Sequence, residues 1–307
     1  MKTMNNTDDF YDGVAENYHL QYERDLMYSL DHKYPANYFR LHLLINSFIK
    51  NNIKRVIEVG VGEGTPLVTM AKAGFDVSGF DVSEKMVKKS QQNFKKNGLN
   101  TENIIFGDIQ DPIGYSPILK SGQFDGLLAM GVMPHVENDK YVLENMKTLV
   151  RPGGKVFIEF RNKLFSLSTF NRNTYEFLMD DLFVNTSGKL REELSSFLKD
   201  KLEMDHPNKR IKGNENDDFK SSKDIGYDSI LSKFHNPFEV IDLFKELEFQ
   251  DPKLLWYHYH PSVPYLEKNN KKDFRHQGIK YEHENSGWRG MFLCSAFVVE
   301  ATIPEIE

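Results

Sequence analysis

The sequence has little cysteine, no excess of basic residues and no long apolar run. Its single cysteine, Cys294, cannot form an internal disulfide. Residues 291–299 around it form an apolar run, which predicts a strand and a buried structural thiol rather than a nucleophile. With 39 basic and 45 acidic residues the formal charge is -6. Such a charge creates no general attraction for phosphate backbones or anionic lipid, so we expect no nucleic-acid partner.

Membrane insertion and secretion are also not expected. No apolar run approaches the roughly 18 residues that cross a bilayer. The first residues lack the positive region and following apolar stretch of a secretory signal, which favours a cytoplasmic protein. Hydrophobic residues make up 39% of the chain and charged residues 27%, as is typical of soluble globular proteins.

Short β-branched runs alternate with helical patterns through the first half of the chain. We predict helices at 35–49, 66–73, 83–97 and 139–150, and strands at 55–59, 76–80, 103–106, 124–130 and 155–160. The Arg-Pro-Gly-Gly stretch at 151–154 predicts a turn before the last of these strands. This order implies parallel strands joined by right-handed crossovers, with helices on both faces of the sheet.

After Arg161 the alternation stops. Residues 164–233 predict an inserted helical cap, whose helix has one apolar face made of Leu190, Leu194, Phe197, Leu198 and Leu202. A helix at 237–247 and strands at 253–259 and 290–301 follow. Because 267–287 contains no helical run long enough for a crossover, we expect the last two strands to pair antiparallel. The predicted units are an N-terminal helical segment (1–50), a core (51–163 and 234–307) and the cap.

A glycine-rich loop follows the first strand. Glycines at 60, 62 and 64 allow a ligand to approach the backbone, and the next helix presents unpaired N–H groups there. A nicotinamide dinucleotide site prefers G-x-G-x-x-G, whereas here the second gap is one residue and Thr65 occupies the last position. The spacing argues against an NAD(P)-dependent oxidoreductase without excluding one.

The loop resembles the first motif of the class I S-adenosylmethionine-dependent methyltransferases. That motif is an acidic residue, a spacer and G-x-G-x-G, matched here by Glu58, Gly60, Gly62 and Gly64. The resemblance implies a Rossmann-like, doubly wound α/β fold: a mostly parallel seven-stranded sheet with an antiparallel last strand, plus the cap insertion. It also implies S-adenosyl-L-methionine as cofactor and methyl transfer to a small molecule.

Further cofactor contacts follow from the same resemblance. Asp81 ends the second strand, where a carboxylate accepts ribose hydroxyls, and Val82 comes next. Asp108 and Ile109 occupy the segment that meets adenine in the family. The remaining cofactor candidates are Met130, near the amino-acid end, and Tyr11 and Tyr18, in an N-terminal segment that folds over the cofactor. Packing of an N-terminal helix on the core is the alternative for the two tyrosines.

Several residues are candidates for binding the methyl acceptor. A hydroxyl acceptor benefits from a general base, and His135 lies just beyond the fourth strand, although packing is its alternative role. Arg161, Tyr257 and His258 are candidate acceptor-binding residues, with sheet packing as the alternative for the last two. No metal site is predicted. The expected acceptor atom is O or N, in a sugar or other hydroxylated metabolite, but the sequence does not fix whether O, N or C is methylated. The oligomeric state stays open, as does a catalytically inactive cofactor-binding protein of the same fold.

Overall fold

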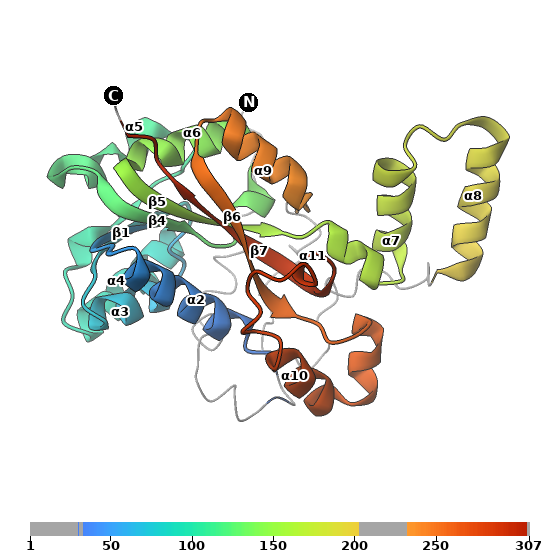
Figure 1. Ribbon diagram of the computed structural model, residues 1–307. Helices are drawn as coiled ribbons and strands as arrows, with labels where there is room; N and C mark the ends of the chain where they lie inside the picture. The colour runs from blue at the N-terminus through green and yellow to red at the C-terminus, as the bar shows by residue number, and fades with distance from the viewer. Residues whose placement is uncertain (1–29, 31–32, 203–231, 306–307) are drawn as a thin grey trace.

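The protein folds around one seven-stranded sheet. The computed structural model describes residues 30, 33–202 and 232–305 (Figure 1). The strand order is β3-β2-β1-β4-β5-β7-β6, and β7 runs antiparallel to both β5 and β6 while the remaining pairs are parallel. The strands are β1 (Arg55–Val59), β2 (Asp76–Asp81), β3 (Ile104–Phe106), β4 (Phe124–Ala129), β5 (Val150–Arg161), β6 (Gln250–Tyr259) and β7 (Cys294–Thr302). The predicted fold class and the antiparallel pairing of the last two strands are confirmed.

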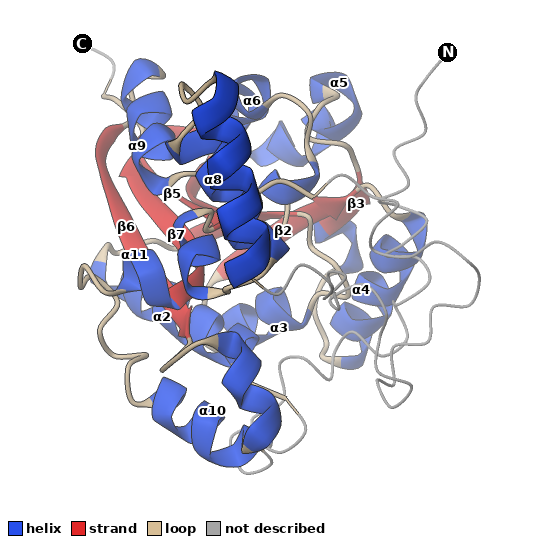
Figure 2. Cartoon of the chain, turned by 90° about the vertical axis from the view of Figure 1, so that its right-hand side faces the viewer, coloured by secondary structure: helices blue, strands red, loops and turns tan. Residues whose placement is uncertain are grey.

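Helices cover both faces of the sheet. One face carries α2 (Ala36–Lys50), α3 (Thr65–Lys72) and α4 (Glu84–Lys96), and the other carries α6 (Asp139–Leu149) and α9 (Pro237–Glu246) (Figures 1 and 2). Local sequence explains these helices, as α4 illustrates. The Ser83 side chain accepts a hydrogen bond from the Met86 N–H at 3.1 Å, and Lys95 and Lys96 lie in the last turn, where the helix dipole favours cations.

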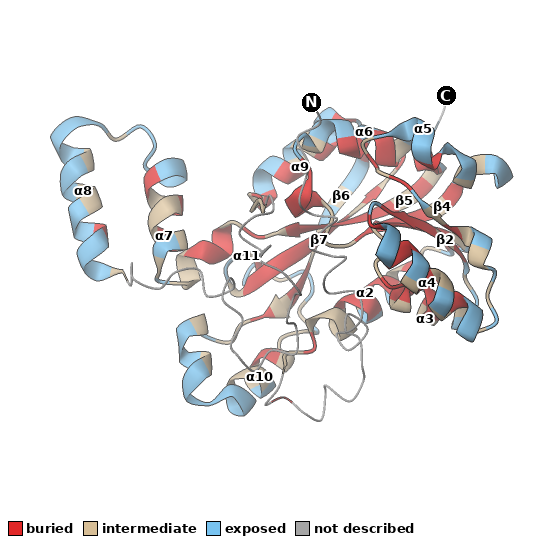
Figure 3. Ribbon diagram, turned by 180° about the vertical axis from the view of Figure 1, so that it is seen from behind, coloured by how far each residue is buried: buried red, intermediate tan, exposed pale blue. Residues whose placement is uncertain are grey.

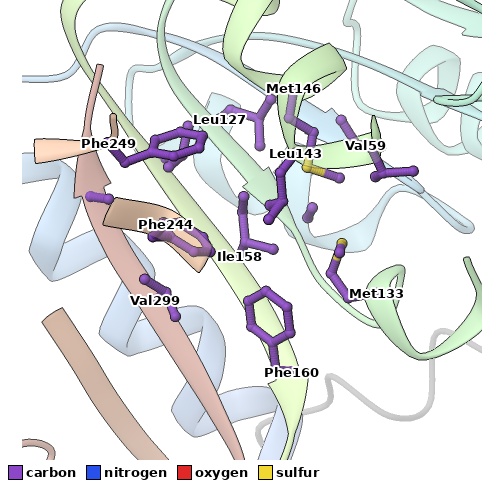
Figure 4. Close-up of a cluster of buried hydrophobic side chains, with 14 of the residues drawn as sticks. Val59, Leu127, Met133, Leu143, Met146, Ile158, Phe160, Phe244, Phe249 and Val299 are labelled. Atoms are coloured by element: carbon purple, nitrogen blue, oxygen red, sulfur yellow. The ribbon is translucent and has the colours of Figure 1, made fainter. Parts of the chain in front are cut away.

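Each face of the sheet forms its own apolar layer. On the α6 and α9 face, Leu143 and Phe244 pack against Leu127 and Ile158 (Figure 4). On the α2 face, Phe48 is fully buried beside Phe157, with ring centroids 4.9 Å apart. The sheet is therefore buried on both sides, whereas the helices expose their outer faces (Figure 3).

The predicted turn at 151–154 is wrong. Strand β5 begins at Val150, five residues before the expected start. Val150 of β5 pairs with Phe124 of β4, and the next pair is Lys155 with Gly126. The four β5 residues between these pairs therefore lie opposite a single β4 residue, which is a bulge in the strand. Both Val150 and Phe124 are buried, and this early contact extends the strand backwards.

The connection between β6 and β7 contains helices that were not expected. These are η9 (Pro264–Asn269), α10 (Lys271–Ile279) and α11 (Gly290–Leu293). Asn270 caps α10 by accepting from the Asp273 N–H at 3.2 Å. The predicted strand start at residue 290 is also wrong, because α11 lies there and Gly290 packs so closely on Trp256 that a Cβ would collide with the indole. Cys294, the first residue of β7, is fully buried as predicted.

The segment after β5 forms a helical pair that stands away from the sheet (Figure 1). It consists of α7 (Arg172–Glu176), a π-helical turn (Phe177–Leu182) and α8 (Gly188–Lys201). The predicted helix is present as α8, but its apolar residues are not all covered: Leu198 is buried, whereas Leu190 and Phe197 are 65% and 58% exposed. Helix α8 instead turns a mixed face to the preceding helix, where the Tyr175 and Ser195 hydroxyls are 2.9 Å apart.

Shorter helices complete the described part of the chain. They are η3 (Thr101–Asn103), α5 (Pro112–Tyr115), η4 (Ser116–Ser121), η5 (Met133–His135) and η6 (Leu164–Ser168). Among the described residues, no helix has both the length and the apolar character needed to cross a membrane.

Candidate cofactor and acceptor site

The strand order places a ligand crevice between β1 and β4. From β1 the chain proceeds to β2 and β3 on one side and then returns to β4 and β5 on the other. In such sheets the loops diverge above this point, and ligands bind at the carboxyl ends of the strands there. Those ends lead directly into Gly60, after β1, and Met130, after β4.

The loop after β1 has a backbone that requires glycine. Gly60, Gly62 and Gly64 have φ angles of 74°, 54° and 85°, in the left-handed region. At Gly60 a Cβ would also lie 2.7 Å from the Val132 side chain, so the segments after β1 and β4 approach each other closely. The N–H group of Gly60 donates to the Phe80 carbonyl at 2.9 Å, which fixes the loop to the end of β2.

Asp81 links this loop to the end of β2. One carboxylate oxygen accepts from the Gly62 N–H at 2.8 Å and the other from the Ser83 N–H at 2.9 Å. A carboxylate at the end of the second strand is the kind of acceptor that ribose hydroxyls use in such folds. The position of Asp81 therefore fits the predicted contact with a ribose.

Apolar side chains are exposed next to Asp81. Val82 is 39% exposed, and Phe106, which pairs with Asp81 across β2 and β3, is 53% exposed. Ile109 is buried, and its carbonyl accepts from the Asn145 side chain at 2.8 Å. Asp108 accepts from the Gln110 N–H at 2.9 Å. An apolar surface beside a carboxylate suits the flat, partly polar adenine ring.

Glu58 is a buried acid with unused hydrogen-bonding capacity. It is 2% exposed, and its Oε2 atom has no hydrogen-bond partner among the residues that the structure describes. Burial raises the pKa of Glu58 well above its ordinary value; the charge of Arg40 lowers it, and Asp81 and Glu63 raise it further. A buried acceptor of this kind requires a donor, and the ammonium group of a bound amino acid would supply one.

Arg40 is a buried charged residue that the sequence analysis did not single out. On α2, its Nη1 atom is 2.5 Å from Oε2 of Glu159 on β5, and each side chain is 9% exposed. Arg40 lies one helical turn before the buried Leu44, on the face of α2 that contacts the sheet. A charged residue on an apolar helix face was the signal available in the sequence, because a buried arginine needs a partner.

The predicted acceptor residues share one edge of the sheet. His135 follows β4 and is buried, Arg161 ends β5 and donates to the Ser232 hydroxyl, and His258 lies near the end of β6. The His258 Nδ1 atom is 2.8 Å from Ser295 Oγ. These positions are consistent with an acceptor site that follows the carboxyl ends of β4, β5 and β6.

Tyr257 lies deeper than the sequence suggested. It is 3% exposed, and burial, followed by the charge of Glu159, raises the pKa of its hydroxyl well above the ordinary value. His258 has a φ of 61°, and its ring stacks on Tyr34 with centroids 5.1 Å apart. The predicted cofactor contacts Tyr11 and Tyr18 lie outside the described residues.

Comparisons with known proteins agree with this geometry. The family model described as methyltransferase domain matches residues 57–158. Ubiquinone biosynthesis O-methyltransferase of Bordetella avium (strain 197N) is 33% identical over 125 residues, which is 41% of this chain and 46% of that protein. The enzyme of the same name from Acinetobacter baumannii (strain AYE) is 32% identical, with 41% and 47% covered. The chain thus matches just under half the length of these relatives.

Two solved structures resemble the protein at low identity. A methyltransferase from Thermotoga maritima, described as a possible histamine N-methyltransferase, has a TM-score of 0.46 and 12% identity, with 96% of this chain and 99% of that chain covered. Phosphoethanolamine N-methyltransferase 2 of Haemonchus contortus, solved with S-adenosyl-L-methionine, also has a TM-score of 0.46 and 12% identity, with 96% and 57% covered.

The strand order and the glycine loop define a Rossmann-like methyltransferase fold. Residues 57–158 match the methyltransferase domain family, and the strand order is consistent with a class I S-adenosylmethionine-dependent methyltransferase. The predicted family and cofactor are confirmed at this level.

Proposed function

We propose that this protein transfers the methyl group of S-adenosylmethionine to a small-molecule acceptor. The observation that carries the proposal is the left-handed glycine loop, joined to Asp81 at the point where the strand order reverses. The cofactor, when bound, supplies an electrophilic methyl group on a sulfonium centre.

The residues present fit each part of this cofactor. Asp81 would accept the ribose hydroxyls, and Val82, Asp108 and Ile109 would surround adenine. Glu58, with its unpartnered buried oxygen, would accept from the ammonium group, and the backbone at Met130 would face the same end. Arg40, whose charge acts on Glu58, would attract the carboxylate of the same end.

We further propose that the acceptor is a hydroxylated metabolite and that methyl transfer is to oxygen. His135, Arg161 and His258 would line its site, and His135 would take the hydroxyl proton. The names of the Bordetella avium and Acinetobacter baumannii relatives support an oxygen acceptor. Alignment of the nucleophile, the methyl carbon and the sulfur, with water excluded, provides most of the catalysis in such a displacement.

Calorimetry with S-adenosylhomocysteine tests the cofactor assignment. We expect saturable binding to the folded protein, and no binding at high micromolar ligand would refute the proposal. Tritium transfer from labelled S-adenosylmethionine into a pool of metabolites then tests turnover. Binding without any labelled product would favour the inactive protein of the same fold.

A further inference from the structure

The segment from Ser232 to His235 pairs with the chain at the end of β5. The His235 N–H donates to the Arg161 carbonyl at 2.8 Å, and the His235 carbonyl accepts from the Lys163 N–H at 2.9 Å. Asn162 and His235 accordingly form an isolated parallel bridge. The Arg161 guanidinium also donates to the Ser232 hydroxyl. This segment therefore lies directly beside Arg161, one of the proposed acceptor-binding residues.

The same segment is joined to the turn that follows β4. The Lys233 N–H donates to the carbonyl of Pro134 at 2.9 Å, and His135 is the next residue of that turn. Ligands of such sheets bind outside the carboxyl ends of the strands. Because the segment bonds to the chain after both β4 and β5, it borders the place where the proposed function puts the methyl acceptor.

The His235 side chain is buried and is held by a carboxylate. It is 8% exposed, and its ring packs edge-on against Phe160, which Figure 4 shows, with centroids 5.0 Å apart. Its Nε2 atom lies 3.1 Å from Oδ2 of Asp139, the first residue of α6. The other carboxylate oxygen of Asp139 accepts from the Lys233 ammonium group at 2.7 Å. Asp139 thus fixes two side chains of the segment to the start of α6.

Asp139 also determines which ring nitrogen carries the proton. Burial raises the pKa of Asp139, but the hydrogen bonds with His235 and Lys233 bring it below its ordinary value. An ionised carboxylate can only accept hydrogen bonds, so a neutral imidazole at this position donates from Nε2. Its Nδ1 atom then carries a lone pair and is a hydrogen-bond acceptor.

The Nδ1 atom of His235 is a buried acceptor in need of a donor. It makes no hydrogen bond within the described part of the chain. Burying an acceptor without a partner is costly, so most buried polar atoms in native proteins are paired. The O–H group of a bound molecule would supply the donor that this chain lacks there.

We propose that His235 is an acceptor-binding residue, whose Nδ1 atom accepts a hydrogen bond from a hydroxyl group of the methyl acceptor, and that Asp139 is its positioning residue. This inference rests on the proposed function. In that function His135 takes the proton of the reacting hydroxyl, so His235 binds a second one. The acceptor is accordingly a molecule with at least two hydroxyl groups. The sequence analysis did not single out His235.

The experiment compares two substitutions that each keep one half of the imidazole. His235→Gln places an amide nitrogen near the position of Nε2 and retains the bond to Asp139, but has no polar atom near the position of Nδ1. His235→Asn places an amide oxygen near Nδ1 and is too short to reach Asp139. Tritium transfer from labelled S-adenosylmethionine into a mixture of sugars, polyols, phenols and simple alcohols measures turnover, and urea titration measures stability.

The two variants should rank in opposite orders. We expect His235→Gln to be the more stable, because Asp139 keeps its partner. It should nevertheless transfer label about tenfold more slowly than the wild-type protein when the mixture is limiting, the effect of one lost hydrogen bond. His235→Asn should be less stable and yet transfer label faster than His235→Gln. Both should bind S-adenosylhomocysteine within about twofold of the wild-type affinity, as expected of substitutions away from the cofactor.

His276→Gln is the matched control. His276 lies on α10 and is exposed, so the same change of side chain there should alter neither label transfer nor stability. Analysis of the wild-type products tests the acceptor class, because label should be found on compounds with two or more hydroxyl groups.

The outcomes separate the two proposals. If the wild-type protein transfers no label, the proposed function fails. If it transfers label, and His235→Gln is as fast as His276→Gln or the two His235 variants transfer label in the order of their stabilities, the role of His235 is overturned while the proposed function stands. Label found only on compounds with one hydroxyl group would overturn it as well. Should His235→Asn not fold, the comparison of His235→Gln with His276→Gln decides.

Discussion

At the scale of single residues, Asp81 has two tasks in this site. Its carboxylate holds the glycine loop through the Gly62 N–H and the start of α4 through the Ser83 N–H. The same oxygens are the proposed acceptors for the ribose hydroxyls. A change at Asp81 therefore affects both the loop and the ligand.

We expect Asp81→Ala to weaken S-adenosylhomocysteine binding by about 1.5–3 kcal/mol, because charge-assisted hydrogen bonds to the ribose are lost. Calorimetry measures the change. Asp76→Ala provides the control, since Asp76 begins the same strand and its side chain is 64% exposed. An unchanged affinity in Asp81→Ala would mean that the ribose lies elsewhere.

Glu282 is a buried carboxyl whose protonation affects the stability of the folded protein. It accepts from the Tyr34 hydroxyl and from the N–H groups of Tyr259, at 2.9 Å, and His258, at 3.2 Å. Burial raises the pKa of Glu282 to about 7, although these hydrogen bonds lower it. The folded protein therefore holds this proton more tightly than the unfolded chain does.

A raised pKa in the folded state predicts stability that is lost as the pH rises. The contribution of Glu282 is fully present below its unfolded pKa of 4.5 and disappears as the pH passes about 7. Across that window the slope is at most about 1.4 kcal/mol per pH unit. Urea titrations between pH 4.5 and 8 should show a smaller slope for Glu282→Gln. Glu248→Gln, which alters a carboxyl that is 84% exposed, is the control and should retain the wild-type slope.

At the scale of elements, the glycine loop shows how one backbone conformation joins three strands. The loop follows β1, bonds to the end of β2 and leaves space for Val132 after β4. Both the left-handed φ and the lack of a Cβ are required at Gly60, because Val132 occupies the adjoining space.

Gly60→Ala should therefore lower the free energy of unfolding more than the same substitution at another glycine with a left-handed φ. Gly98, after α4, has a φ of 71°, and a Cβ there would meet nothing within 4 Å. We expect Gly98→Ala to cost about 1–2 kcal/mol of unfolding free energy from backbone strain alone. Gly60→Ala should cost more and should also abolish S-adenosylhomocysteine binding. Denaturant titration and calorimetry give both quantities; equal costs with binding retained would contradict this account of the loop.

At the scale of the whole molecule, a methyltransferase and an NAD(P)-dependent oxidoreductase differ in the ligand that stabilises the folded protein. Because a ligand that binds only the folded state stabilises it by mass action, S-adenosylhomocysteine at 100 times its dissociation constant should add about 2.7 kcal/mol. A thermal-shift measurement should show a higher melting temperature with this ligand and no shift with NAD⁺ or NADP⁺. Stabilisation by a nicotinamide dinucleotide alone would instead support the oxidoreductase.

The inserted cap owes the burial of its side chains to tertiary packing. Helix α8 stands beside α7 and away from the sheet (Figure 3), and among the described residues Arg191 of α8 donates to the carbonyl of Met179 in the π-helical turn. The sequence pattern of leucines and Phe197 indicates an amphipathic helix, but it does not reveal which face receives a partner. Only the packing against α7 shows that Leu198 is buried while Leu190 and Phe197 are exposed.

The sequence by itself determined the parts of this protein that depend on local periodicity and spacing. The expected bounds of β1 and of α3, α4 and α6 agree with the structure to within about a residue, because each element combines a regular apolar pattern with local caps or turns. The spacing of Gly60, Gly62 and Gly64 likewise predicted a tight loop after β1, and all three glycines have left-handed φ angles. Long-range contacts were decided only by the tertiary structure. The burial of Arg40 against Glu159 joins segments more than 100 residues apart. The backward extension of β5 depends on its pairing with β4. No local pattern encodes such pairings, because their free energy arises from surfaces that meet only when the sheet has formed.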